Sequence, residues 1–336
     1  MNQPRVIKRI RVSIGSAIVL RLLNGRLDAK PTTAYLLTYK EEKCTANCAF
    51  CPQARTSSAR SDKLSRVTWL PFPLKQVFSG IKRTVQRGEI KRVCIQALNY
   101  PTVFKDLLAL VKQLRLYTEV PISLSCQPLN CKKLKELLQA GVERISIALD
   151  AATKKLFDQL KGKWVGGPYV WERQRRTLLD AVKIFGEGLV TTHLIVGLGE
   201  TEREMVQTIQ WSVDSKVYPS LFAFTPIRGT ALENRPPPSV DHYRRIQIAQ
   251  HLITRGEARF ENMKFNPNGK IVDFGVPKNL LLNTVKSGRP FLTSGCPNCN
   301  RPYYNERPGG PIYNYPRPLT REEILEIEKQ VKGFRV

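Results

Sequence analysis

Cys44-Thr-Ala-Asn-Cys48-Ala-Phe-Cys51 places three cysteines within a single short segment of the chain. Thiolates select zinc, copper(I) or iron–sulfur centres, and a closed structural site would add a fourth protein ligand. Neither Cys nor His follows closely in the sequence, so this segment supplies three ligands. The spacing therefore indicates an iron–sulfur cluster with one iron left open for a small molecule.

This cysteine segment follows Thr33-Ala-Tyr-Leu-Leu-Thr-Tyr39, an apolar run typical of a buried strand. A C-x3-C-x2-C motif after a first strand resembles the radical S-adenosylmethionine (SAM) superfamily, where it holds a [4Fe–4S] cluster. The resemblance implies that SAM binds the open iron and that its reductive cleavage gives a 5′-deoxyadenosyl radical, which abstracts hydrogen from unreactive C–H bonds. It assigns Cys44, Cys48 and Cys51 as cluster ligands and catalytic residues, and it places Phe50 beside the adenine. A zinc ribbon or scattered buried thiols are the alternatives.

Short β-rich runs alternate with amphipathic helices after the first cysteine motif. We expect six strands, near residues 34–39, 92–98, 121–126, 143–150, 189–198 and 221–227, with helices at 103–117, 132–140, 154–160, 171–185, 202–215 and 241–255. Such β/α units, joined by right-handed crossovers, form a parallel sheet that curls on itself. The predicted fold class is therefore α/β, a partial or full (β/α) radical SAM barrel over residues 31–260. Functional groups in such barrels sit at the carboxyl ends of the strands.

The two ends of the chain differ from this barrel in composition and in the spacing of their apolar residues. Residues 1–30 contain an amphipathic segment at 6–27, which we predict to be an N-terminal helical extension without chemistry. Residues 261–336 are expected to form a C-terminal region. Within it, the stretch 296–318 is rich in Pro, Gly, Tyr and Asn and shows no helical or strand period. An irregular segment of this length is usually functional or disordered, and its two cysteines predict that a metal orders it.

Composition agrees with an intracellular enzyme. A chain of 336 residues with 42% hydrophobic residues can bury a full core. Apolar stretches are too short for a membrane span, no secretory signal is apparent, and eight cysteines in a reduced compartment point to metal rather than disulfides. We expect a cytoplasmic protein. The net charge of +26 predicts an acidic partner protein, nucleic acid or an anionic surface, and charge alone does not choose among them.

Two further segments resemble SAM-binding elements of the superfamily. Ile195-Val-Gly-Leu-Gly-Glu200 ends the fifth strand, and the resemblance implies that Ile195, Gly197 and Glu200 contact the adenine; His193 stands where the family has a first glycine. Asp150 resembles the position that binds the SAM ribose hydroxyls. The alternative for Asp150 is an N-cap for the next helix. Charged residues 41–43, before the cysteine segment, are expected to be solvated.

Five cysteines remain outside the motif: Cys94, Cys126, Cys131, Cys296 and Cys299. The last two form a C-x2-C pair, a common half of a metal site. A single buried cysteine is often only a small apolar side chain, but five of them favour a second metal centre. For its ligands we predict Cys126, Cys131, Cys296 and Cys299, with Cys94 as a fifth candidate able to replace any of these.

The tail from Ser294 to Pro318 is similar to the C-terminal region of the archaeal two-component lipoyl synthases, biotin-synthase-like proteins that work as a pair. Cys94 and Cys126 also look like cluster ligands of biotin synthase. The resemblance implies a second [4Fe–4S] cluster, whose sulfide is inserted at C6 or C8 of an octanoyl chain on a carrier lysine. Implied partners are a carrier such as glycine cleavage protein H or a lipoyl domain, a second lipoyl synthase component and a ferredoxin-like electron donor. Such carriers are acidic, which would suit the net charge.

Three other functions stay open at the level of sequence. A biotin synthase-like enzyme would insert sulfur into a small molecule. An RNA methylthiotransferase would also use two clusters and a basic surface, but we find no RNA-binding module, so nucleic acid is not the expected partner. A zinc-binding interaction protein would lack catalysis altogether. No partner membrane is predicted.

Overall fold

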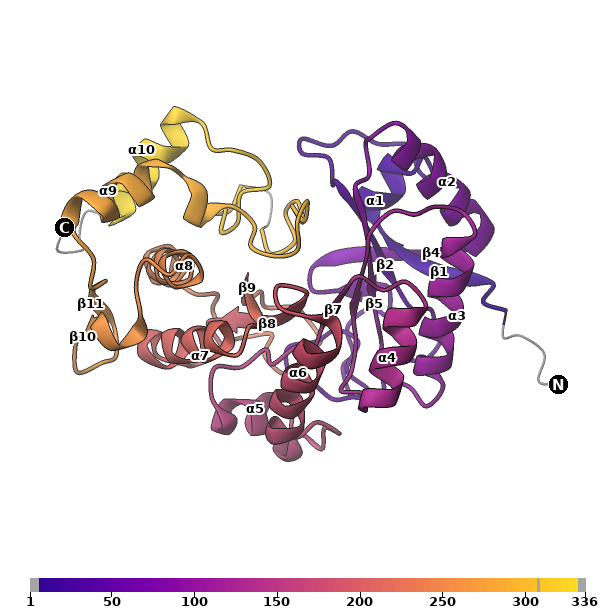
Figure 1. Ribbon diagram of the computed structural model, residues 1–336, viewed down its shortest axis with the longest axis horizontal. Helices are drawn as coiled ribbons and strands as arrows, with labels where there is room; N and C mark the ends of the chain where they lie inside the picture. Colours follow the sequence, from indigo (N-terminus) through magenta and orange to yellow (C-terminus); the bar gives the residue numbers. More distant parts are fainter. Residues whose placement is uncertain (1–5, 307–308, 332–336) are drawn as a thin grey trace.

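The computed structural model describes residues 6–306 and 309–331. Its main sheet has nine strands in the order β3-β4-β1-β2-β5-β6-β7-β8-β9. Six neighbouring strands run parallel, which confirms the predicted β/α series, and the sheet curls into a partial barrel (Figure 1). The parallel strands are β2 (Thr33–Leu37), β5 (Arg92–Gln96), β6 (Ile122–Ser125), β7 (Arg144–Ser146), β8 (Val190–Val196) and β9 (Tyr218–Ala223).

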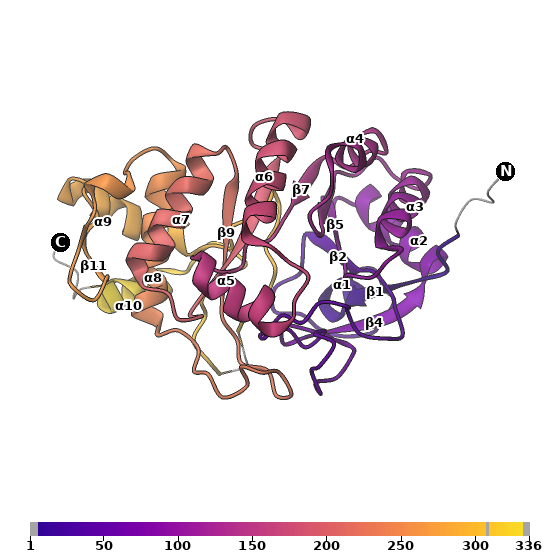
Figure 2. The ribbon, with the colours of Figure 1, turned by 90° about the horizontal axis from the view of Figure 1, so that it is seen from below.

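Amphipathic helices connect these strands and cover the outside of the sheet (Figures 1 and 2). Most bury an apolar stripe and expose a polar face, as in α3, where Leu107, Leu110 and Leu114 are buried, whereas α8 also buries polar residues such as Arg244 and Gln247. The helices are α2 (Leu74–Gln86), α3 (Val103–Arg115), α4 (Cys131–Gln139), α5 (Lys154–Leu160), α6 (Trp171–Phe185), α7 (Glu202–Asp214) and α8 (Val240–Thr254). All except α2 lie where the sequence predicts them.

The N-terminal segment corrects one prediction. Residues 9–13 form strand β1 (Arg9–Ser13), and only α1 (Ile14–Val19) is helical, so the expectation of a helical extension is wrong for this stretch. β1 pairs antiparallel with β2 and with β4 (Val67–Pro73), and β4 also pairs with the short β3 (Lys63–Leu64). Ile10 and Val12 are fully buried, and this burial in a sheet outweighs the helix-like spacing of the apolar residues.

The helices and small strands of the C-terminal region lie at the far end of the molecule from β4 and α2, as both views show, whereas its tail returns to the barrel (Figures 1 and 2). This region contains a small antiparallel pair, β10 (Lys264–Phe265) and β11 (Ile271–Asp273), and two helices, α9 (Lys278–Lys286) and α10 (Arg321–Val331). Helix α10 contacts α8 and α9. Within the described parts of the chain, every helix is too short or too polar to cross a membrane.

A buried carboxylate joins three of these elements. Glu202, at the start of α7, is 3% exposed and lies 2.6 Å from the Arg245 guanidinium of α8. Its second oxygen accepts the backbone N–H of Ile271 at 2.7 Å, at the start of β11. His242 approaches the same carboxylate at 3.0 Å. Glu202 therefore fixes the C-terminal region against the barrel.

Replacement of Glu202 by Ala should lower the free energy of unfolding by about 3 kcal/mol, because it removes the buried carboxylate partner of Arg245 and leaves that arginine only the more exposed Asp241 at 3.0 Å. Chemical denaturation of the two proteins would measure this. The matched control is Glu204→Ala on the same helical turn, which removes only a capping interaction with Thr201 and should cost about 1 kcal/mol. Equal losses in the two variants would contradict a special role for the buried pair.

Candidate active site

The first three cysteines lie in a loop that follows β2, at the carboxyl ends of the parallel strands. Hydrogen bonds to distant parts of the chain hold its backbone. Cys44 N–H donates to Gln53 O at 3.0 Å, Thr45 N–H to Asn99 O at 2.8 Å, and Ala49 N–H to Leu160 O at 2.7 Å. The loop is thus tied to its own continuation, to the segment after β5 and to the end of α5.

Lys43 secures the same loop from inside. Its ammonium group donates to the carbonyl oxygens of Pro52 at 3.0 Å, Ser57 at 2.5 Å and Ala59 at 2.6 Å. The expectation that Lys43 is solvated is therefore wrong, because three carbonyls replace water around its charge. A lysine just before a cysteine motif was the available sequence signal, but its partners lie up to sixteen residues away.

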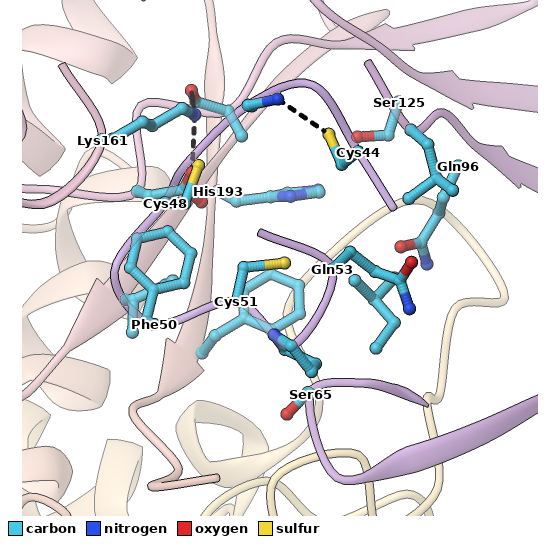
Figure 3. A pocket seen from close by; sticks show the side chains of 18 of the residues that line it. Cys44, Cys48, Phe50, Cys51, Gln53, Ser65, Gln96, Ser125, Lys161 and His193 are labelled. Atoms are coloured by element: carbon cyan, nitrogen blue, oxygen red, sulfur yellow. Dashed lines mark hydrogen bonds and ion pairs between the residues drawn. The ribbon is translucent and has the colours of Figure 1, made fainter. Parts of the chain in front are cut away.

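The cysteine loop faces a cavity of about 220 Å³, hereafter the upper cavity. Figure 3 shows the sulfur atoms of Cys44, Cys48 and Cys51 turned toward the space they share. Burial raises the pKa of all three thiols, to about 12 for Cys51. Cys44 Sγ accepts backbone N–H groups from Ala46 and Asn99, at 3.4 and 3.1 Å, and such donors stabilise a thiolate.

These residues fit an iron–sulfur cluster better than a single ion. Within the described residues, no group of three Cys, His, Asp or Glu side chains lies close enough to hold one metal ion. A cluster spreads its irons over a larger volume and is held by thiolates, which matches three separated cysteines around a cavity. Gln127 and Gln174 also line this cavity, and each buries a side-chain oxygen that has no partner in the structure. Buried polar atoms of this kind normally have a partner, so a ligand is expected here.

A buried ion pair forms one wall of the upper cavity. Lys161 Nζ lies 2.6 Å from Asp150 Oδ2 and also donates to Ala148 O at 2.7 Å. Asp150 has a φ of +64°, a strained value for a residue other than glycine and one that is common at functional sites. The next helix is capped by Thr153 rather than by Asp150, which removes the alternative role as an N-cap. Sequence reasoning missed Lys161, because an isolated lysine after a helix carries no signal.

In the segment from Ile195 to Glu200, only Ile195 lines the upper cavity, and the residues after it form a turn that supports it. Ile195 and Phe50 both line the upper cavity and pack against a small apolar cluster that includes Leu198 and Phe224. Glu200 does not line it; its carboxylate accepts the N–H groups of Gly197 and Leu198, at 2.6 and 3.0 Å. Gly197 has a φ of +103°, and a Cβ there would come within 2.8 Å of Pro238. Gly197 and Glu200 therefore shape the turn that presents Ile195.

A second cavity, of about 80 Å³, lies deeper in the barrel and is lined by Cys94, Cys296 and Cys299. We call it the lower cavity. The Ser123 hydroxyl lies 3.3 Å from Cys296 Sγ, and the Tyr35 hydroxyl lies 3.4 Å from Cys299 Sγ. Burial raises the pKa of both Cys94 and Cys299, and the neighbouring Cys296 raises the pKa of both further.

The predicted grouping of the second cysteine set is corrected by this arrangement. Cys126 lines the upper cavity, just past the carboxyl end of β6, and Cys131 is exposed as the first residue of α4. Neither lines the lower cavity, whereas Cys94 does, alongside the C-x2-C pair. The reason is the position of each cysteine along its strand. Cys94 lies in the middle of β5, whereas Cys126 follows the last residue of β6.

The tail reaches Cys94 by crossing the amino ends of the strands. Asn298 O accepts the hydroxyl groups of Thr32 and Thr33, at 2.7 and 2.9 Å, where β2 begins. Pro297 O accepts Arg92 Nε at 3.0 Å, where β5 begins. The C-x2-C pair therefore closes the end of the barrel opposite the cysteine loop.

The upper and lower cavities adjoin each other inside the barrel, with five side chains between them. Gln96, Ser125, His193, Phe222 and Tyr304 line both cavities. Burial lowers the pKa of His193 to about 4, so its ring is neutral near neutral pH. A neutral ring between the two sites adds no charge to the space where a substrate would lie.

Comparison with known proteins identifies the family. A family model described as the radical SAM superfamily matches residues 42–212, just over half of the chain. The chain belongs to the radical SAM superfamily. Membership implies a [4Fe–4S] cluster and SAM as cofactors, and the cysteine loop and upper cavity are the part of this radical SAM protein that fits them.

Two curated relatives are similar in sequence. A biotin synthase from Chlamydia pneumoniae is 24% identical over 252 residues, which cover 71% of this chain and 70% of the relative. A GTP 3′,8-cyclase from Paenarthrobacter nicotinovorans is 26% identical over 179 residues, which cover 52% of this chain but only 46% of the cyclase.

Solved structures are similar in fold. Methylornithine synthase (PylB) aligns with a TM-score of 0.52 at 13% identity, over 66% of this chain and 62% of that one. The FeFe-hydrogenase maturase HydG from Carboxydothermus hydrogenoformans aligns with a TM-score of 0.51 at 12% identity, over 66% of this chain and 52% of that one. The match thus spans less than two thirds of either structure, and at these identities the likeness is one of fold alone.

Replacement of Cys48 by Ala should reduce the iron of the anaerobically reconstituted protein by about four atoms per chain, because the two thiolates that remain in the loop cannot hold the cluster. Iron analysis and the visible charge-transfer absorption would measure the loss, together with loss of 5′-deoxyadenosine formation. The control is Cys131→Ala, since Cys131 is exposed and outside both cavities. Equal iron losses in the two variants would contradict the assignment.

Proposed function

We propose that this chain is a sulfur-inserting radical SAM enzyme, a lipoyl synthase component that adds sulfur to C6 or C8 of an octanoyl-lysine on an acidic carrier protein. One observation carries the proposal: Cys94, Cys296 and Cys299 line a cavity in the same lumen as the cysteine loop. A second cluster held there would lie across the lumen from SAM. A substrate between them would meet the hydrogen-abstracting group and the sulfur source at once.

The residues of the lower cavity fit such a group. Three thiolates are the expected donors for an iron–sulfur cluster, and Arg301 lines the cavity beside them. Arg301 Nε is buried without a partner in the structure, although the same guanidinium donates to Ser294 O at 2.6 Å. Ser123 and Arg301 supply non-thiolate groups for the remaining position. Ser294 is less suited, because it does not line the lower cavity and its hydroxyl accepts the N–H of Leu221.

When bound, the loop cluster would supply the electron that cleaves SAM, and the second cluster would supply sulfide. The net reaction would consume one SAM, one electron from a ferredoxin-like donor and one sulfide of the second cluster. It would yield methionine, 5′-deoxyadenosine that carries the substrate's hydrogen, and a thiolated substrate, with the electron released by the sulfide left on the iron of that cluster. The chain itself holds the substrate carbon near both groups and excludes water from the lumen.

The choice of substrate rests on the tail and on charge. The tail resembles those of the two-component lipoyl synthases, and a net charge of +26 would steer an acidic carrier such as glycine cleavage protein H or a lipoyl domain. A second synthase component would then add the other sulfur. The relation to a biotin synthase supports a second candidate, sulfur insertion into a small molecule. An RNA substrate has no comparable support.

The ligand assignment predicts distinct iron losses. Ala at Cys94, Cys296 or Cys299 should remove about four irons per chain but leave SAM cleavage by the loop site intact. The control is Cys126→Ala, a buried cysteine of the upper cavity, which should keep both clusters. Iron analysis and electron paramagnetic resonance of the reduced proteins would distinguish them. Loss of a cluster only in Cys126→Ala would overturn the assignment.

An anaerobic single-turnover assay with SAM, dithionite and an octanoyl-lysine peptide tests the function itself. We expect a gain of one sulfur by mass spectrometry together with 5′-deoxyadenosine, and fragmentation would identify the carbon. Variants lacking the lower cysteines should release 5′-deoxyadenosine without thiolated peptide. Sulfur transfer to desthiobiotin but not to the peptide would instead support the small-molecule candidate.

A further inference from the structure

A third cavity, of about 410 Å³, opens beside the barrel, and neither cysteine set accounts for it. Its walls come from three segments that are distant in sequence: residues 13–31 around α1, residues 66–69 at the start of β4, and residues 301–304 of the tail. We call it the side cavity. It exists because β1 and β4 extend the sheet beyond β2, and the tail then crosses in front of them.

The side cavity meets both cavities of the lumen. Gln96 and Tyr304 line all three, and Tyr35 and Arg301 are shared with the lower cavity. The Tyr304 ring packs edge-to-face on Phe222, which lines the upper and lower cavities. A chain entering from the side would therefore arrive at Gln96 and Tyr304, where the two cysteine sites face each other.

The lining of the side cavity suits a linear apolar chain with a charged carrier outside. Leu27, Pro31 and Trp69 contribute apolar surface, and Ile14 is left 45% exposed at the cavity, a large apolar side chain without full cover. Arg26 lines the cavity and is exposed, and Arg66 lines it from another segment, so the lining holds these two arginines against one acidic residue, Asp28. Burial of methylenes inside and attraction of carboxylates outside are the two interactions that a tethered acyl chain on an acidic protein needs.

The tail wall carries backbone strain where it faces this cavity. Arg301 and Tyr303 have φ values of +30° and +54°, and neither is glycine. The Tyr303 hydroxyl donates to Asp28, which joins the tail wall to the N-terminal wall. Strained residues persist where the surrounding structure over-determines them and cluster at ligand sites. Here they line the passage between the surface and the lumen.

We propose that the side cavity is the channel through which an acyl chain, tethered to a lysine of an acidic carrier protein, enters the lumen. This inference rests on the proposed function and adds the route, the shape of the substrate and the docking surface around Arg26. A small free substrate would need neither an elongated apolar passage nor a basic rim. The terminal part of the chain lies at Gln96 and Tyr304, and the lysine stem lies between Ile14 and the tail.

Photo-crosslinking tests the route without depending on turnover. The probe is an acidic peptide whose lysine carries an octanoyl analogue with a diazirine near its carbonyl end, irradiated anaerobically with the reconstituted full chain. We expect labels at side-cavity residues 26–31, 66–69 and 301–303, mapped by peptide mass spectrometry. Labels confined to residues 44–53 and 222–225, which line the upper cavity and lie outside the side cavity, would overturn the route but leave the proposed function standing. No label at any residue would count against the octanoyl substrate itself.

A blocking variant tests the same route by activity. Ala29 lines the side cavity, and Ala29→Trp should lower sulfur transfer to the octanoyl peptide at least tenfold. Asn24→Trp is the control, since Asn24 is exposed in the same segment and does not line the cavity. Iron content and melting temperature must match in both variants. Equal transfer by Ala29→Trp and Asn24→Trp would overturn the inference, whereas absence of transfer by the unmodified protein would overturn the proposed function.

A charge reversal tests the carrier surface. Arg26→Glu should raise the KM for an octanoylated acidic carrier at least fivefold and change the KM for a short neutral octanoyl-lysine peptide little. Arg83→Glu on α2, an exposed arginine away from the side cavity, makes the same change in net charge and is the control. Equal effects of the two reversals would show general steering by net charge and would overturn docking at Arg26.

Discussion

Parallel pairing of short strands is the constraint on which the site depends. In the β2–β5 ladder, Thr33 is opposite Arg92 and Leu37 is opposite Gln96, so all carboxyl ends meet at one mouth of the barrel and all amino ends at the other. A five-residue strand spans about 16 Å. The cysteine loop lies at one mouth and the C-x2-C pair of the tail at the other, so the two cysteine sets face the same lumen from opposite ends.

The elements that sequence predicted well are those with a strong period. α6 begins at Trp171 and ends at Phe185, as its amphipathic pattern indicates, and β8 lies within the expected 189–198. β1 and β4 were missed because their apolar residues are spaced ambiguously and their pairing is antiparallel, so no β/α alternation marks them. Pairing with distant strands, not local preference, decides their conformation.

The candidate site likewise contains residues that the sequence predicted and residues that it did not. Cys44, Cys48 and Cys51 were predictable because a local spacing encodes the loop, and their shared cavity follows from its position after β2. The partners of Cys296 and Cys299 were not, because the tail has no period and its route is set by hydrogen bonds to Thr33 and Arg92, far away in sequence. Lys161 was missed, and Lys43 was wrongly expected to be solvated, for a related reason: the role of a lysine is known only when the carbonyls or carboxylate around it are known.

Charge balance explains why the two cysteine sites tolerate burial. At the lower site, Arg301 and Arg92 both lower the cost of ionising Cys94 and Cys299, opposing the larger effect of burial. At the upper site, Lys161 does the same for Cys48. Arg92 is itself fixed by Glu143 at 3.1 Å and by Ser123, so its charge cannot turn away to water. Buried cations that are already held in place need no rearrangement when thiolates form. The buried ring of His193, which lines both cavities, stays uncharged near neutral pH and so adds no charge to those that Arg301 and Lys161 already supply.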